Sequence, residues 1–262
     1  MTNRIDKLFS EKKKNILSIY FTAGFPQLKD TMAILSALQK YGADLVEVGM
    51  PYSDPLADGP VIQHSSSVAL LNGISIKALF EQLKYCRQTV HLPLILMGYL
   101  NPVMQYGIEK FCMDAHNTGI DGIILPDLPL PEYEAEHQQL FQKYNLHFIF
   151  LITPETGEDR IRKIDDASNG FIYAVSSSST TGTAKNFERQ ERYFERLEKM
   201  KLKNKVLVGF GIKDHKTFSQ ACKHAAGAII GTEFIRAIEN SGNIDADTKR
   251  FLNSILHPQT IP

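Results

Sequence analysis

The sequence predicts an α/β fold in which eight parallel strands close into one (β/α)₈ TIM barrel. Two observations favour this fold. Short apolar runs recur along the 262 residues, and segments with the 3–4 apolar spacing of amphipathic helices lie between them. Most runs lack polar alternation, as expected of strands buried on both faces. Eight such units fit the usual size of a barrel. A doubly wound open sheet is the competing layout.

The apolar runs define the expected strands, which cover residues 16–21, 45–48, 94–97, 122–125, 148–152, 171–175, 206–210 and 228–230. The expected intervening helices cover residues 31–41, 108–116, 132–144, 188–200 and 217–224. The second and third strands start 49 residues apart, which leaves room for extra helical segments at 62–71 and 74–89. Further helices are expected at 3–14, before the first strand, and at 233–239, after the eighth.

Composition and charge narrow the class of protein. We see no linker, so residues 1–262 are expected to form a single domain, with the last dozen residues frayed. Lys+Arg and Asp+Glu both count 29, which argues against nucleic-acid or membrane-surface binding. No apolar run approaches the length of a membrane span, and no secretory signal is evident. The odd number of cysteines, 3 in all, indicates reduced thiols and a cytoplasmic location.

The most informative segment runs from Glu47 to Gln63. It places the carboxylate of Glu47 in an apolar strand and delivers a second carboxylate, Asp58, from a loop rich in Pro, Gly and Asp. Burying a carboxylate without compensation is costly, and proton transfer is one reason to tolerate that cost. Both residues follow or end the second strand, where barrel enzymes carry their chemistry. The alternatives are a structural ion pair for Glu47 and a turn-setting role for Asp58.

A second pattern predicts a phosphate site. Gly209-Phe-Gly211 follows the seventh strand, and Gly231-Thr232 follows the eighth and opens a short helix. Loops after these two strands form the usual phosphate site of a barrel, because glycines admit backbone N–H groups and a helix end supplies free donors. Each glycine taken singly is more often an ordinary turn residue, and it is the occurrence of both at the expected strand ends that favours phosphate binding.

Two further patterns are weaker. The segment from Ser176 to Lys185 follows the sixth strand and reads either as a mobile lid, with Gly182 near the phosphate, or as a solvated connector. The 8 histidines show no metal-ligand spacing, so no metal site is expected.

The motif Glu47-x-Gly-x-Pro-x-Ser-Asp-Pro-x-Ala-Asp-Gly-Pro-x-Ile-Gln63 resembles the signature of the tryptophan synthase alpha subunit family. The resemblance extends over nearly the whole chain, through the motifs Phe21-Thr-Ala-Gly-Phe-Pro26, Met97-Gly-Tyr-Leu-Asn-Pro102, Pro126-Asp-Leu-Pro129, Gly209-Phe-Gly-Ile212 and Ala228-x-x-Gly231. It implies a (β/α)₈ barrel with added helices, and a lyase that cleaves indole-3-glycerol phosphate by a retro-aldol route to indole and glyceraldehyde 3-phosphate.

The resemblance also assigns roles. Glu47 matches the family's acid/base residue, and Asp58 the carboxylate that accepts the indole N–H. The matching phosphate-binding positions are Gly182, Gly211, Gly231 and Thr232, and the matching substrate-binding positions are Tyr173, Tyr20, Ile124, Phe210 and Thr181. One departure lies in the loop after the sixth strand, where Ser177 and Ser179 replace an arginine and a glycine. That departure bears on lid closure.

The family works with a beta subunit that carries pyridoxal phosphate, so the resemblance implies an α₂β₂ assembly with no cofactor in this chain. The loop from Pro51 to Pro60 and the turn Asn101-Pro102 are the implied contact surface. Three alternatives remain: a stand-alone lyase that releases free indole, a binding module without catalysis, and a phosphate-sugar isomerase on the same barrel. The two carboxylates argue against the second, and the long signature against the third.

Overall fold

In the part of the chain that the structure describes, nine short strands form the centre of the molecule. The computed structural model describes residues 2–176, 184–209 and 211–257, and of residues 184–190 it describes the backbone alone. The strands are β1 (Ile16–Thr22), β2 (Leu45–Gly49), β3 (Leu94–Met97), β4 (Gly122–Ile124), β5 (His147–Phe148), β6 (Leu151–Ile152), β7 (Phe171–Val175), β8 (Lys205–Gly209) and β9 (Gly227–Ile230). Every pairing between neighbouring strands is parallel.

The sheet closes into a barrel through the fifth strand segment, which was expected to be one strand over residues 148–152. That expectation is wrong in one detail, because the segment is divided into two short strands, β5 and β6. The first half pairs with β4 and the second with β7, at the two ends of the strand order β5-β4-β3-β2-β1-β9-β8-β7-β6. Between the halves, the Ile149 N–H donates to Ile123 O at 3.0 Å and the Tyr173 N–H donates to Phe150 O at 3.0 Å. The predicted (β/α)₈ barrel is therefore confirmed, and the open sheet is wrong.

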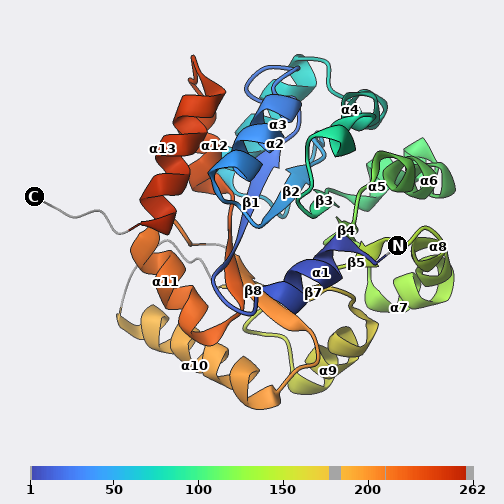
Figure 1. The fold of residues 1–262 in the computed structure, drawn as a ribbon. Coiled ribbons are helices and arrows are strands. Elements are labelled where there is room, and N and C mark those ends of the chain that lie inside the picture. The colour runs from blue at the N-terminus through green and yellow to red at the C-terminus, as the bar shows by residue number, and fades with distance from the viewer. Residues whose placement is uncertain (1, 177–183, 210, 258–262) are drawn as a thin grey trace, which may run out of the picture.

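Helices surround the strands, as Figure 1 shows. They are α1 (Arg4–Glu11), α2 (Thr31–Tyr41), α3 (Pro60–Leu71), α4 (Ile76–Leu83), α5 (Leu100–Tyr106), α6 (Ile108–Thr118), α7 (Leu130–Glu132), α8 (Gln138–Lys143), α9 (Glu158–Ala167), α10 (Ala184–Met200), α11 (His215–His224), α12 (Thr232–Ile238) and α13 (Ile244–Leu256), with a 3₁₀ turn at Cys86–Gln88 and a π-helical turn at Tyr133–His137. None of the helices in the described part of the chain has the length and apolar composition needed to cross a bilayer.

Three helices, α5, α9 and α13, were not expected from the sequence. The prediction that the last dozen residues are frayed is wrong for residues 251–256, which belong to α13. Helix α13 begins at a side-chain cap, because the Asn243 side chain accepts the Ala246 N–H at 3.1 Å. Its Asp245 pairs with Lys40 of α2 at 2.9 Å. Buried Leu252 and Ile255, three residues apart, face the core. The C-terminal segment is thus packed against the barrel up to Leu256.

The barrel has a closed end and an open end. At the N-terminal ends of the strands, Ile5 and Phe9 of α1 pack into an interior apolar cluster with Ile16 and Phe171, and the Phe9 and Phe171 rings lie 5.9 Å apart. Figure 1 shows α1 crossing the middle of the barrel. Side chains on the outward faces of the strands join a second, larger cluster with the surrounding helices. The opposite end, where the strands finish, is left for a binding site.

Beside the closed end, Asp121 holds several elements together. The carboxylate is 3% exposed and directly precedes β4. It accepts hydrogen bonds from Arg4 Nη1 at 3.0 Å and Arg87 Nη2 at 2.7 Å, and from the backbone N–H of Leu94 at 2.9 Å. Two cations and a backbone donor therefore compensate this buried charge, which makes Asp121 a structural residue.

Candidate active site

Glu47 lies in the middle of β2, with its side chain inside the barrel and fully buried. Alternation along the strand explains the direction, since Leu45 joins the interior cluster while Val46 and Val48 join the outer one. Ser18 Oγ on β1 donates a hydrogen bond to Glu47 Oε1 at 2.8 Å. No group in the described residues hydrogen-bonds Oε2.

Burial raises the pKa of Glu47 to about 8, and the Ser18 hydrogen bond lowers it by a smaller amount. Removal from water penalises the charged form, and no cation in the described part of the chain offsets that penalty. The carboxyl group is therefore mostly protonated at neutral pH. The structural ion-pair alternative for Glu47 finds no support among the described residues.

Asp58 lies on the loop between β2 and α3 and is partly buried. The Tyr99 hydroxyl donates to Asp58 Oδ2 at 3.1 Å and accepts the Ala57 N–H at 3.0 Å. Burial raises the pKa of Asp58, and the Tyr99 hydrogen bond lowers it. Tyr99, which the sequence did not single out, thus fixes the carboxylate and its neighbouring backbone together.

A cavity of about 470 Å³ opens where the strands end. Its lining includes Asp58 and five other residues predicted for the site, which are Tyr20, Tyr173, Gly211, Gly231 and Thr232. It also includes residues that the sequence did not single out, among them Met97, Ile229 and Lys213. The structure therefore gathers residues from β1, β7, the β2 loop and the last two strand ends around one space.

Two predicted site residues are not part of this lining. Glu47 lies in the barrel interior close to it. Burial is the main cause that raises the pKa values of the cavity residues Tyr20 and Tyr173, and negative charge on Asp58 and Glu47 raises them further. Ile124 is fully buried in the interior cluster. The remaining three, Phe210, Thr181 and Gly182, lie outside the described residues.

Glycines at strand ends make room for the two tyrosine side chains. A Cβ added to Gly49 would lie 2.2 Å from the Tyr20 hydroxyl oxygen, and one added to Gly209 would lie 2.2 Å from the Tyr173 hydroxyl oxygen. Both distances are far below a van der Waals contact. Gly49 and Gly209 therefore let the aromatic rings pack across the barrel beside Glu47.

The expected phosphate end is built from two separate strand ends. Gly211 has φ +75°, a left-handed conformation that favours glycine. Gly231 precedes α12, and Thr232 is the first residue of that helix. The first N–H groups of a helix lack intrahelical acceptors, so they are available to an anion. Lys213, two residues after Gly211, also lines the cavity.

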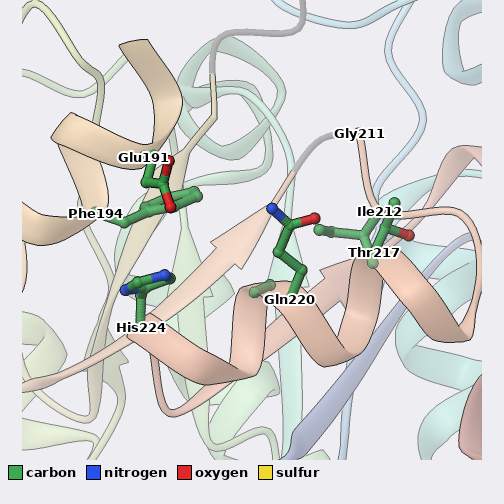
Figure 2. A pocket seen from close by; sticks show the side chains of 8 residues that line it. Glu191, Phe194, Gly211, Ile212, Thr217, Gln220 and His224 are labelled. Atoms are coloured by element: carbon green, nitrogen blue, oxygen red, sulfur yellow. The ribbon is translucent and has the colours of Figure 1, made fainter. Parts of the chain in front are cut away.

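A smaller cavity, of about 70 Å³, lies between α10 and α11. Figure 2 shows Glu191 and Phe194 facing Gln220 and His224 across it. It shares Gly211 and Ile212 with the large cavity. Its volume suits water molecules rather than a bicyclic phosphorylated compound.

Within the described residues, one group has ligand atoms close enough together to hold a metal ion. It consists of Glu132, Glu136 and His137, whose ligand atoms lie within 4.8 Å of one another. This group is on the π-helical turn and its neighbour α7, and none of its members lines the large cavity. The prediction that the chain has no metal site stays a prediction.

Comparison with known proteins identifies the family. A family model described as "Tryptophan synthase alpha chain" matches residues 7–257. The tryptophan synthase alpha chain of Flavobacterium psychrophilum is 54% identical over 241 residues, covering 92% of this chain and 95% of that one. That of Phocaeicola vulgatus is 50% identical over 255 residues, covering 97% and 98%. The chain belongs to the tryptophan synthase alpha chain family.

Solved structures agree with the assignment. The crystal structure of the tryptophan synthase alpha subunit from Legionella pneumophila matches this chain with a TM-score of 0.88 and 34% identity, covering 97% of each chain. The protein is accordingly a lyase of tryptophan biosynthesis, from a family that works with a beta subunit. The alternative of a stand-alone lyase is not favoured.

Proposed function

We propose that the large cavity binds indole-3-glycerol phosphate and that Glu47 and Asp58 cleave it to indole and glyceraldehyde 3-phosphate. The observation that carries this proposal is the placement of two unlike carboxyl groups, Asp58 in the wall of the cavity and Glu47 in the barrel interior close to it. Glu47 is buried without a cation and keeps its proton at neutral pH, whereas Asp58 lies at the cavity wall. One group is suited to give a proton and the other to stabilise positive charge.

The proposed reaction has two proton transfers. Glu47 gives its proton to carbon 3 of the indole ring, which forms an iminium ion. Asp58 accepts the ring N–H and stabilises the positive charge, an electrostatic effect typical of preorganised sites. Glu47, now ionised, takes the proton of the hydroxyl group next to the C3–glycerol bond. That bond breaks, its electrons return to the ring, and Glu47 regains its starting form.

The tail of the substrate would lie at the opposite wall. Gly211 and Gly231 allow backbone N–H groups to approach the phosphate, Thr232 supplies a hydroxyl donor, and Lys213 supplies charge. Gly182 is proposed for the same role, as in the family. Tyr20, Tyr173, Ile124, Phe210 and Thr181 are proposed to contact the indole and glycerol parts.

We further assign the partner surface to the loop after β2 and the turn at α5. Leu56 is 91% exposed on this loop. The Tyr52 and Tyr99 rings lie 5.2 Å apart, and Asn101 Nδ2 donates to the Tyr52 hydroxyl at 3.3 Å, so the two segments are joined. An exposed apolar side chain on an ordered rim suits a protein interface. We propose a beta subunit there, in a cytoplasmic α₂β₂ tetramer whose pyridoxal phosphate is in the partner.

An assay of indole release from indole-3-glycerol phosphate tests the proposed reaction. The purified chain should release indole and glyceraldehyde 3-phosphate in equal amounts, and addition of a beta subunit should accelerate it. Asp58→Asn should lower turnover about 100-fold, as for loss of one preorganised charge, while glycerol phosphate still binds. Glu81→Gln, at an exposed glutamate of α4, is the control. Wild-type turnover in Asp58→Asn would refute the role of Asp58.

The phosphate assignment is tested by a charge-matched pair at Thr232. Thr232→Asp places a negative charge where the phosphate is expected, and Thr232→Asn has nearly the same shape without the charge. Like charges repel across a binding site, so only the aspartate variant should raise KM strongly. Equal KM values for the two variants would place the phosphate elsewhere.

A further inference from the structure

We propose that Ser18 is a positioning residue for Glu47, whose hydroxyl ties down Oε1 so that Oε2 is the oxygen that exchanges a proton with the substrate. This inference deepens the proposed function and rests on the role given there to Glu47. The geometry that carries it is one hydrogen bond inside the barrel, between two residues that are both fully buried.

Ser18 is a polar exception in an apolar layer. On β1 the interior positions alternate, and Ile16, one interior position earlier, belongs to the interior apolar cluster. Ser18 pairs in register with Leu45, and Tyr20 pairs with Glu47. The register partner of Glu47 is thus Tyr20, but its hydrogen bond comes from Ser18, the preceding interior residue of β1. A buried hydroxyl with a partner at 2.8 Å is satisfied, whereas an apolar side chain there would leave Oε1 without a donor.

The two oxygens of Glu47 are unlike because of this bond. Oε1 accepts the hydrogen bond that the Ser18 hydroxyl donates, and Oε2 has no hydrogen-bond partner in the described part of the chain. An oxygen that accepts a hydrogen bond is the better place for negative charge, so the acid proton is carried by Oε2. In the proposed reaction Oε2 gives that proton to the ring, Ser18 stabilises the carboxylate that results, and Oε2 later takes the hydroxyl proton. No proton is gained or lost over the cycle.

The other titratable groups around Glu47 do not replace Ser18. Tyr20 of β1 and Tyr173 of β7 face it, and burial raises both pKa values far above the working range, so both hydroxyls stay neutral. Asp58 acts on these same tyrosines with a negative charge. Among the described residues, Ser18 is therefore the group that favours the ionised form of Glu47.

The test compares Ser18→Ala with Ser18→Thr, which keeps a hydroxyl. A hydrogen bond to a charged group is stronger than one to a neutral group, so loss of the hydroxyl should raise the pKa of Glu47 by about one unit. The basic limb of the kcat/KM profile should move up by the same amount. At neutral pH Glu47 stays protonated but is a weaker acid, so kcat should fall by up to about tenfold, with KM little changed, and Ser18→Thr should recover most of kcat. A purely structural role would lower stability without moving the pH profile.

Infrared difference spectroscopy gives a readout that does not need turnover. The carbonyl stretch of the protonated carboxyl group is identified by its loss in Glu47→Gln. In Ser18→Ala this band should shift to higher frequency, because one hydrogen bond to the group is gone, and should titrate about one pH unit higher. If band and midpoint match the wild type, the Ser18 inference is overturned and the proposed function stands. If Glu47→Gln still releases indole at the wild-type rate, the catalytic roles of both residues are overturned together.

Discussion

Two of the buried carboxylates of this barrel, Asp121 and Glu47, have opposite surroundings. Asp121, beside the closed end, receives hydrogen bonds from two arginines and a backbone N–H. Glu47, in the middle of β2, accepts one hydrogen bond, from the Ser18 hydroxyl, and pairs with no cation among the described residues. Burial alone therefore does not distinguish a structural acid from a reactive one.

The two acids differ in whether neighbouring cations compensate the charge of the buried carboxylate. A buried carboxylate paired with cations joins the elements that supply its partners, here α1, the segment before β3 and the start of β4. An unpaired buried carboxyl group keeps its proton instead, and can give it to a bound molecule. This contrast fits the general pattern of the fold, in which the N-terminal ends of the strands contribute stability and the C-terminal ends carry the active site.

The largest effect is expected when Glu47, the buried acid without a cation partner, is replaced by a residue that cannot exchange a proton. Glu47→Gln should lower indole release about 1,000-fold, within the range of general acid–base catalysis. The fold should remain, because no ion pair in the described structure depends on Glu47. Steady-state turnover and far-UV circular dichroism of the same preparation check both points. Wild-type turnover in a folded Glu47→Gln protein would show that Glu47 is not the proton donor and that the contrast with Asp121 has no catalytic meaning.

The corresponding change at Asp121 should affect stability instead. Asp121→Asn leaves Arg87, which is mostly buried, without its carboxylate, and should lower the free energy of unfolding by about 3 kcal/mol. Turnover per folded molecule should be unchanged. Denaturant titration against Asp166→Asn, whose carboxylate is 81% exposed, measures the difference. A loss no larger than that of the control would show that the Asp121 network is not stabilising.

The pH dependence of stability should separate the two acids further. The folded pKa of Glu47, about 8, lies above its ordinary value of 4.5. The stability linked to its proton is therefore fully present below about pH 4.5, decreases as pH rises and is lost above about pH 8. The wild type should lose up to about 5 kcal/mol relative to Glu47→Gln across that window. Unfolding curves of both proteins at several pH values measure this, and parallel curves would contradict the assignment.

The smallest effect is expected at the second acid. Tyr99→Phe removes the hydrogen-bond donor to Asp58 Oδ2 and should raise the Asp58 pKa, moving the acidic limb of the pH–rate profile upward. Turnover at neutral pH should fall about fivefold, the value of one ordinary hydrogen bond. Tyr85→Phe, at an exposed tyrosine, is the control. Matching profiles for the two variants would remove Tyr99 from the site.

The sequence predicted what depends on local patterns. The barrel follows from repeated apolar runs, and Glu47 and Asp58 stand out because both lie in one short segment. The partners of these acids could not be predicted, because Ser18 is 29 residues from Glu47, Tyr99 is 41 from Asp58, and Arg4 is 117 from Asp121. Nor could a local pattern show that the fifth strand is divided, since that depends on its two neighbours in the barrel.

The central claim is that Glu47 keeps its proton at neutral pH. Carbon-13 NMR of protein labelled at the glutamate side-chain carboxyl carbons measures this directly, with Glu47→Gln identifying the resonance. We predict a titration midpoint near pH 8 in the free alpha chain. A midpoint near the ordinary value of 4.5 would show that Glu47 is ionised at neutral pH and would contradict its assignment as the proton donor.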